Sequence, residues 1–523
     1  MSAHLGEWEI VYDGENPLDT QQTAVHACLI YNPNSNKWKV LYFRASNPPT
    51  DTPLVETKIW NPDDTTNPIS TQQIPDWPSW NSPPDPVLPP DDLHGRLFCS
   101  GHCFLADGNL LVAGGHRTVP AGHPWARGML FSYIFNPVNE TWNYERISPN
   151  HVRMQDGRWY PTTTLLADRT VVVSGGFRYN YSPVHDPTLV FNNDIEIYDP
   201  AVPSWTYLGP TANNPYIANY PGVHVIPYGN FAGELFYSIP VQESYRFNPE
   251  GPSWNTVASS SLYRTHGCSV LLPLLPGQTS VRIMIIGGLE NEDVNATKTC
   301  EIINLNDGTP SWSATGDMAN GRNNANAVIL PDGKVLVVGG NLKGGYTGPV
   351  YMSEVYDPAT GLWSTLVSQQ YQRKYHSTAL LLPDGRVWSA GSEDTAGGSN
   401  FTNLEIYSPG YLFEGARPQF YTPPPSNISY GATFSINTDV PIDSAVLIKP
   451  GSTTHAFDQD QRFVGLNLGP AIINGGYTYE ATAPANGNIA PPGYYMLFVV
   501  RPKSASSSGQ HKIPSIAKFV KLS

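Results

Sequence analysis

Residues 326–340 read NAVILPDGKVLVVGG, and this stretch decides the fold. Two apolar runs flank Pro-Asp-Gly, which is a strong signal of a β-hairpin, and the closing Gly-Gly ends the pair of strands. The same unit recurs in residues 103–115 (CFLADGNLLVAGG), 162–176 (TTTLLADRTVVVSGG) and 377–391 (STALLLPDGRVWSAG), with longer or weaker copies in residues 268–288, 222–238 and 25–44. A hairpin repeated along a chain is typical of a repeat architecture.

A second hairpin follows each Gly-Gly. It reads as an acidic residue or Tyr, a turn and a Trp, as in residues 196–205 (EIYDPAVPSW) and 354–363 (EVYDPATGLW). Seven such four-stranded units predict an all-β fold, a seven-bladed β-propeller, and the Gly-Gly with its downstream aromatics resembles Kelch repeats. Because an open ring would leave exposed strand edges, we expect residues 6–12 (GEWEIVY) to close it against the last blade.

Two regions lie outside the repeat. Residues 62–90 are rich in Pro, Asp and Trp, and they are predicted to form a long irregular loop on one face. After Tyr407 the pattern changes to short alternating strands, which predict an immunoglobulin-like β-sandwich. The expected domains are a propeller over residues 1–410 and a C-terminal sandwich over residues 411–523.

Composition narrows the function. The formal net charge is −14 and no basic stripe is present, which argues against a nucleic-acid partner. No run approaches the roughly 18 apolar residues of a membrane span. The first residues lack the features of a signal peptide, so we expect either a cytoplasmic protein or a mature form. Five cysteines are too sparse for a disulfide scaffold or zinc site, and each is expected to be a buried thiol; whether Cys268 and Cys300 pair stays open.

A propeller by itself does not define a function, so the chemistry must come from particular residues. Tyr375 and His376 stand where the seventh inner strand starts, Cys99 where the second starts and Tyr160 where the third starts. These strand starts crowd around one end of the central channel, so the four side chains could converge there. Taken singly, Cys99 reads as a buried thiol, Tyr160 as a core aromatic, and His455, in the C-terminal domain, as a surface residue.

Four motifs in order resemble the copper-radical oxidases, which include galactose oxidase and glyoxal oxidase. They are Phe-Cys-Ser-Gly (98–101), Gly-Arg-Trp-Tyr (157–160), Tyr-His-Ser with LLPDGRV (375–387), and Thr-His with Asp-Gln-Arg (454–462). The resemblance implies one copper per chain. It implies Tyr160, His376 and His455 as equatorial ligands, Tyr375 as the axial ligand, and a thioether between Cys99 and the Tyr160 ring.

The reaction implied by this resemblance is a two-electron oxidation of a small aldehyde or primary alcohol by O2, giving H2O2. Imidazoles and phenolates suit Cu(II), which supplies one oxidising equivalent. A radical on Tyr160 would hold the second, and the thioether would lower its potential. Tyr375 would take the substrate proton as general base, and Tyr160 would take a hydrogen atom from carbon.

Three departures from galactose oxidase argue against galactose as substrate. The carbohydrate-binding domain is missing. Residues 322–325 lack galactose oxidase's aromatic and His. Gly175-Gly176 is followed by Phe177 and Arg178, where galactose oxidase has a stacking Trp. Either Phe177, Trp77 or Trp80 replaces that indole, or the stability of the radical differs. We expect Phe177 and Arg178 to contact substrate, although Arg178 is equally consistent with a solvated loop charge, and we expect the site to be closer to glyoxal oxidase.

Two alternatives stand beside the oxidase. A non-enzymatic Kelch propeller that binds a protein or glycan would keep the channel residues only as structure, and copper content separates it from an oxidase. A glycosidase would need a pair of carboxylates facing the channel, and no repeated position supplies one.

Overall fold

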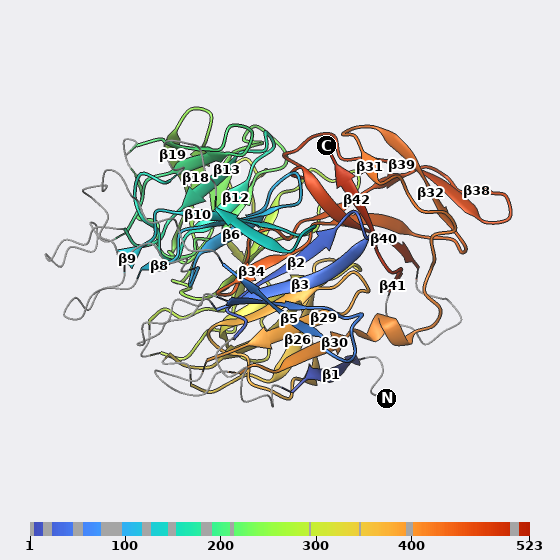
Figure 1. Ribbon diagram of the computed structural model, residues 1–523, viewed down its shortest axis with the longest axis horizontal. Coiled ribbons are helices and arrows are strands. Elements are labelled where there is room, and N and C mark those ends of the chain that lie inside the picture. The colour runs from blue at the N-terminus through green and yellow to red at the C-terminus, as the bar shows by residue number, and fades with distance from the viewer. Residues whose placement is uncertain are drawn as a thin grey trace, which may run out of the picture.

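The computed structural model describes residues 5–13, 23–44, 56–74, 97–117, 127–144, 153–178, 191–209, 214–291, 294–344, 347–393, 401–502 and 512–523. Almost all of its regular structure is β-strand (Figure 1). Seven antiparallel sheets follow the predicted repeats, so the propeller prediction is confirmed.

Each blade runs from an inner strand at the channel to an outer strand. The strands are β2 (His26–Asn32), β3 (Lys37–Phe43), β4 (Glu56–Trp60) and β5 (Ile69–Gln73) in blade 1; β6 (Gly101–Phe104), β7 (Leu110–Ala113), β10 (Ser132–Asn136) and β11 (Thr141–Tyr144) in blade 2; β12 (Thr162–Leu165), β13 (Val171–Ser174), β14 (Glu196–Asp199) and β15 (Ser204–Tyr207) in blade 3; and β16 (Val223–Val225), β17 (Leu235–Tyr237), β18 (Glu243–Asn248) and β19 (Ser253–Ser259) in blade 4.

The remaining blades follow the same order. They contain β20 (Cys268–Leu271), β21 (Arg282–Ile286), β22 (Cys300–Asn304) and β23 (Ser313–Ala314) in blade 5; β24 (Asn323–Ile329), β25 (Val335–Asn341), β26 (Met352–Asp357) and β27 (Leu362–Ser368) in blade 6; and β28 (Ser377–Leu381), β29 (Val387–Gly391), β30 (Leu404–Ser408) and β1 (Glu7–Tyr12) in blade 7. A small ribbon, β8 (His116–Arg117) with β9 (Arg127–Gly128), stands apart.

The ring closes through the N-terminal strand. Strand β1 pairs antiparallel with β30, so the last blade takes its outer strand from the start of the chain. This confirms the expected closure. The prediction for residues 62–90 was partly wrong, because Ile69–Gln73 forms β5 against β4. Residues 75–90 of that segment, with Trp77 and Trp80, lie outside the described residues.

Close packing between blades explains the Gly-Gly signature. A Cβ on Gly287 would lie 2.3 Å from the Arg322 carbonyl oxygen of the next blade, and the Gly288 N–H donates to that same oxygen at 2.9 Å. The Arg322 side chain in turn binds Glu354, and both side chains are fully buried. Equivalent buried pairs are Arg158–Glu196, Arg264–Glu301 and Arg373–Glu405. The arginine just before each of these inner strands is therefore structural, and it anchors the start of the strand.

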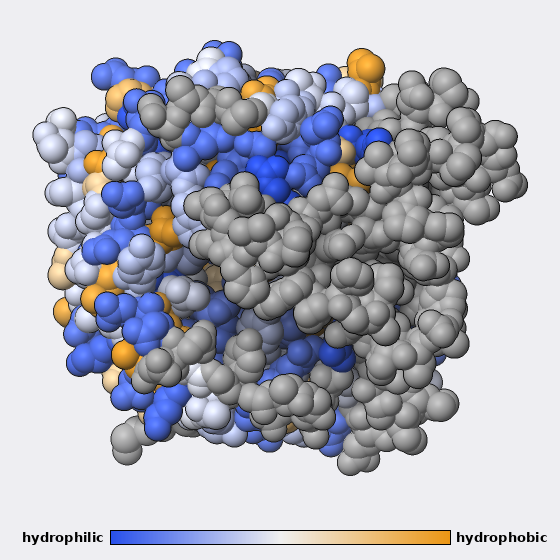
Figure 2. All heavy atoms as spheres, turned by 90° about the vertical axis from the view of Figure 1, so that its left-hand side faces the viewer, coloured by the Kyte–Doolittle hydropathy of each residue, from blue (hydrophilic) through white to orange (hydrophobic). Residues whose placement is uncertain are grey.

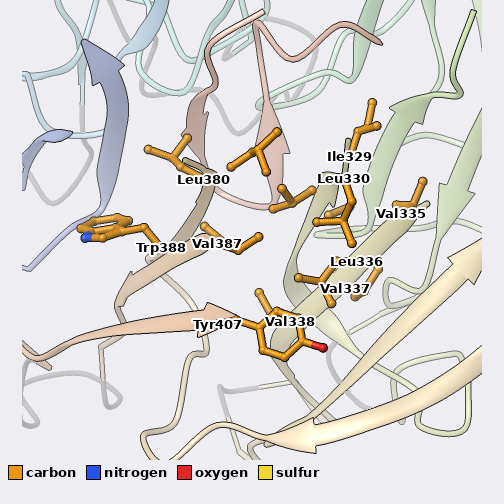
Figure 3. Close-up of a cluster of buried hydrophobic side chains, with 14 of the residues drawn as sticks. Ile329, Leu330, Val335, Leu336, Val337, Val338, Leu380, Val387, Trp388 and Tyr407 are labelled. Carbon is orange, nitrogen blue, oxygen red and sulfur yellow. The ribbon is translucent and has the colours of Figure 1, made fainter. Parts of the chain in front are cut away.

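Apolar side chains fill the space between neighbouring blades. Figure 3 shows Leu336 and Val338 of blade 6 packed near Leu380 and Val387 of blade 7, all completely buried. All five cysteines are buried and free, so Cys268 and Cys300 do not pair.

The C-terminal segment folds as two packed sheets after η3 (Gly410–Phe413). One sheet contains β31 (Asn427–Ile428), β33 (Ser444–Ile448), β36 (Phe463–Gly465), β40 (Gly493–Arg501), β41 (Ile513–Pro514) and β42 (Lys518–Leu522), and the other contains β32 (Thr433–Thr438), β37 (Asn467–Leu468), β38 (Ile472–Ile473) and β39 (Tyr477–Thr482). These strands lie beside the propeller in Figure 1.

One hairpin of this segment enters the propeller. Strand β34 (Ser452–Thr454), with β35 (Phe457–Asp458), pairs with β2 at the inner edge of blade 1, and Thr454 lies opposite His26. Figure 1 accordingly shows β34 among the propeller strands, beside β2. The residue that follows β34 is His455, so this pairing carries it to the channel.

Candidate metal centre

A single backbone conformation recurs where the inner strands start. In six blades a non-glycine residue with positive φ stands there: Cys99 (56°), Tyr160 (71°), Tyr220 (43°), His266 (55°), Asn324 (54°) and His376 (63°). Backbone hydrogen bonds join successive blades through these residues. The Tyr160 N–H donates to the Cys99 carbonyl at 2.9 Å, and the Tyr220 N–H donates to the Tyr160 carbonyl at 2.8 Å. Left-handed backbone costs about 1 kcal/mol or more for such residues, and strain of this kind is typical of functional sites.

The structure brings the candidate site residues together. The Cys99 Sγ lies 3.5 Å from His455 Nε2 and 3.8 Å from His376 Nε2. These three atoms all lie within 4.8 Å of one another, and all three residues are buried. The phenol oxygens of Tyr160 and Tyr375 lie 3.1 Å apart. The His455 ring stands nearly perpendicular to those of Tyr160, Tyr375 and His376, at interplanar angles of 79°, 77° and 84°.

Tyr375 and His376 reach the same site because they precede β28. Their ring centroids lie 3.7 Å apart, which adjacent residues within a strand could not achieve. The His376 Nδ1 lies 2.8 Å from a carboxylate oxygen of Glu393, whose other oxygen lies 3.1 Å from Arg44 Nε. Such a carboxylate orients a metal-binding imidazole and leaves the lone pair of its Nε2 available.

His455 is oriented by the residue before it. The Thr454 hydroxyl donates to the Val25 carbonyl at 2.8 Å, so its oxygen accepts from His455 Nδ1 at 2.6 Å. The proton therefore sits on Nδ1, and the Nε2 lone pair faces Cys99 and His376. Both bonds depend on the hairpin that lies against blade 1.

Burial sets the charge state of the site. It lowers the pKa of His455, as do the nearby His376 and His26. It also lowers the pKa of His376, although Glu393 opposes the shift. Burial raises the pKa of Tyr160, and Cys99 and Tyr375 raise it further. Two neutral imidazoles and the protonated phenol of Tyr160 are the state that a metal ion would meet.

These donors fit copper. Two imidazole Nε2 atoms with free lone pairs lie close together, and the rings of both tyrosines, with paired phenol oxygens, pack against His455. Imidazole is a common ligand of copper. Cys99 belongs to a buried cluster against which Tyr160 packs, as a bond between them would require. The structure itself carries no metal ion.

Trp159 was missed as a site residue. Its ring stacks on Tyr160, with centroids 4.3 Å apart and planes inclined by 30°. Phe177 lies farther from Tyr160, at 6.2 Å and edge-on. The indole that was sought after Gly175-Gly176 is thus supplied by the residue directly before the tyrosine.

A pocket of about 320 Å³ opens beside the centre. It is lined by Trp159, Tyr160, Phe177, Asn219, Tyr220, Ile239, Pro240, His266, Gly267, Tyr375, His455 and Phe457. Tyr220 and His266 were also missed, although they occupy the repeat position of Cys99 and Tyr160. Aligning all seven repeats at that position would have found them.

Arg178 does not line this pocket, which revises the expectation for it. Its guanidinium binds Asp156 at 2.6 Å and Asp194 at 3.1 Å, and it donates to the Phe191 carbonyl. Two carboxylates neutralise it, and contact with substrate would break those ion pairs. Phe177 does line the pocket, and its contact with substrate stays a prediction.

Comparisons with known proteins agree with this geometry. The family model described as glyoxal oxidase N-terminus matches residues 88–411, and the galactose oxidase-like early set domain matches residues 417–522. An aldehyde oxidase from Vitis pseudoreticulata is 29% identical, covering 81% of this chain and 82% of the relative. A galactose oxidase from Gibberella zeae is 27% identical, and the match covers 82% of this chain but 61% of that protein.

The fold has a close structural counterpart. A solved fungal alcohol oxidase of the AA5 family, in complex with copper, superposes with a TM-score of 0.76 at 22% identity and covers 99% of this chain. At that identity, the likeness concerns the fold.

Proposed function

The chain belongs to the glyoxal oxidase family of copper-radical oxidases, and we propose that it oxidises a small aldehyde or primary alcohol at the centre formed by Cys99, Tyr160, Tyr375, His376 and His455. A primary alcohol and O2 would give an aldehyde and H2O2. Two observations carry the proposal: the Nε2 atoms of His376 and His455 lie within 4.8 Å of each other, and the paired tyrosines Tyr160 and Tyr375 both pack against His455.

We assign each of these residues a role. His376, His455, Tyr160 and Tyr375 would hold one copper ion, which when bound supplies one of the two oxidising equivalents. Tyr160, bonded through its ring to Cys99, would hold the second as a radical. Tyr375 accepts the proton of the substrate hydroxyl, and the Tyr160 oxygen accepts the hydrogen atom from the adjacent carbon. Glu393 and Thr454 keep the two imidazoles in orientation.

The pocket supports small, mostly apolar substrates. Its volume of about 320 Å³ lies near the lower end for ligand pockets. Trp159, Phe177 and Phe457 give it apolar aromatic walls. Galactose would place several hydroxyl groups against these walls, and each buried hydroxyl without a partner costs about 1–3 kcal/mol. A hydrated aldehyde presents the same H–C–OH unit as an alcohol with fewer groups to satisfy.

Binding partners other than a small substrate are less consistent with the charge and the hydropathy of the surface. The net charge of −14 argues against nucleic acid. Hydrophilic residues predominate among the described residues of the face in Figure 2, where hydrophobic ones stand singly. No helix among the described residues has the length and apolar character to cross a membrane.

The test is an H2O2-coupled assay on copper-loaded protein with glyoxal or methylglyoxal, benzyl alcohol and galactose. We expect kcat/KM for the best aldehyde or simple alcohol to exceed that for galactose at least ten-fold. Galactose as the best substrate would overturn the substrate assignment and leave the oxidase intact. Protein that binds no copper and makes no H2O2 would instead favour a binding propeller.

A further inference from the structure

A buried hydrogen-bond chain lies behind Cys99. The Cys99 N–H donates to His26 Nε2 at 3.0 Å. His26 Nδ1 lies 2.9 Å from His102 Nε2, and His102 Nδ1 lies 2.5 Å from the Ser452 hydroxyl oxygen. All four residues are completely buried. The chain joins blade 1, blade 2 and the hairpin that carries His455.

The groups at the two ends of this hydrogen-bond chain determine which nitrogen of each histidine carries the proton. His26 Nε2 accepts from a backbone N–H, so its proton is on Nδ1 and donates to His102 Nε2. The proton of His102 is then on Nδ1 and donates to Ser452, whose hydroxyl donates to the His102 carbonyl at 3.0 Å. Burial lowers the pKa of His26, and it lowers that of His102 to about 3, which keeps both rings neutral.

The His26 side chain takes the place of a backbone carbonyl in the series of hydrogen bonds that links successive blades around the channel. In blades 3 and 4 the residue with positive φ donates its N–H to the matching carbonyl of the preceding blade. In blade 1, the Val25 carbonyl is engaged by Thr454 of the inserted hairpin. The Cys99 N–H is bonded to the His26 side chain instead. The His26 ring is itself held by stacking on Phe43, at 4.6 Å and 15°.

We propose that His26 is a positioning residue for formation of the Cys99–Tyr160 thioether: by accepting the Cys99 N–H, it holds Cys99 at a φ of 56°, in the cluster against which Tyr160 packs. His102 and Ser452 hold His26 in the tautomer that can accept. The inference rests on the proposed function, because the thioether belongs to that mechanism.

The covalent step balances with O2 as oxidant. The S–H bond of Cys99 and one ring C–H bond of Tyr160 break, and an S–C bond forms. Two protons and two electrons pass to O2, which becomes H2O2. The product is two hydrogens lighter than the reduced chain, so intact mass follows the step without any measurement of substrate turnover.

Two substitutions at His26 test whether its role depends on the hydrogen-bond acceptor at Nε2 or only on the size of the side chain. Asn can place its amide where Nδ1 stands and still donate to His102, but it cannot reach the Cys99 N–H. Gln is one methylene longer and can place an oxygen where Nε2 stands. We expect His26→Asn to slow thioether formation at least ten-fold and His26→Gln to stay within about three-fold of wild type, each with one copper bound.

The experiment follows intact mass and gel mobility after copper is added to reduced, aerated protein. His224→Asn is the control, because His224 is another histidine of an inner strand, β16, partly buried and hydrogen-bonded to Ser269. Equal rates for His26→Asn and wild type would overturn the inference. So would a His26→Gln as slow as His26→Asn, or a control as slow as either. If wild-type chain forms no thioether, the proposed mechanism itself fails.

Discussion

The phenol oxygens of Tyr160 and Tyr375 lie 3.1 Å apart, although 215 residues separate them in the chain. Blades 3 and 7 each deliver one of these oxygens to the channel, and the rings of both tyrosines pack against His455. In the proposed mechanism, a substrate hydroxyl gives its proton to Tyr375 and the adjacent carbon gives a hydrogen atom to Tyr160.

Replacing Tyr375, the proposed proton acceptor, should slow the oxidation of substrate without preventing formation of the thioether. We expect Tyr375→Phe to lower kcat by about 10²-fold or more, the usual contribution of general acid–base catalysis. The thioether should still form, because neither of its atoms is changed. Steady-state kinetics with parallel intact mass measurement checks this, and a kcat within three-fold of wild type would contradict the role of Tyr375.

The cross-link should depend on both copper and O2. Copper-loaded, aerated wild type should lose two hydrogens and migrate faster on a denaturing gel, and Cys99→Ser should show neither change. Cys103→Ser is a suitable control, because Cys103 is equally buried but lies within β6. A peptide map with free Cys99 in loaded wild type would refute the cross-link.

The inserted hairpin should be needed for metal binding. We expect wild type to hold one copper per chain, and His455→Ala to bind copper at least ten-fold more weakly, because one of two imidazole ligands is lost. Metal analysis after dialysis against a weak chelator measures this. His224→Ala should bind as wild type does, and equal copper in His455→Ala would sink the assignment of His455.

Trp159 should protect the radical on Tyr160. Its stacked indole shields the ring, and such aromatic pairs contribute about 1 kcal/mol. We expect Trp159→Leu to make the optical or electron-spin signal of the radical decay several-fold faster, with copper content unchanged. Phe177→Leu should have a smaller effect, since Phe177 meets Tyr160 only edge-on. The opposite order would show that Phe177 has the protecting role.

His224, a partly buried histidine outside the proposed set of copper ligands, should make the fold acid-sensitive. Burial lowers the pKa of His224 to about 3, whereas an unfolded chain has about 6.5. Between these values the unfolded state binds one more proton, so the free energy of unfolding falls as pH falls, by about 1.4 kcal/mol per unit. His224→Gln should lack this slope.

Urea unfolding of both proteins between pH 8 and pH 4 tests the prediction. The stability difference between them should stay constant above pH 7 and shift toward the variant below pH 6. Carboxylates titrate in both chains and cancel in the comparison. Parallel curves over the whole range would mean that His224 does not titrate on unfolding.

The sequence alone was sufficient for the blades, because each is built from hairpins whose partners are adjacent in the chain. The unit in residues 326–340 specifies β24 and β25 through local turn chemistry. Its Gly-Gly is needed because the backbone of the next blade approaches too closely for a Cβ. The same logic placed Tyr375 and His376 at a strand start. The irregular loop predicted for residues 62–90 was wrong at β5, because pairing with β4 outweighs the weak strand signal of that segment.

Only the tertiary structure decided how the site is assembled. No local pattern shows that β34 lies against β2, yet this pairing brings His455 to Tyr160 and occupies the Val25 carbonyl. The stacking of Trp159 on Tyr160 depends on backbone conformation at a strained position, and the ion pairs of Arg178 depend on carboxylates 16 and 22 residues away. Contacts of this kind depend on the docking of whole elements, and the energy that selects them is spread over buried surfaces that no single motif encodes.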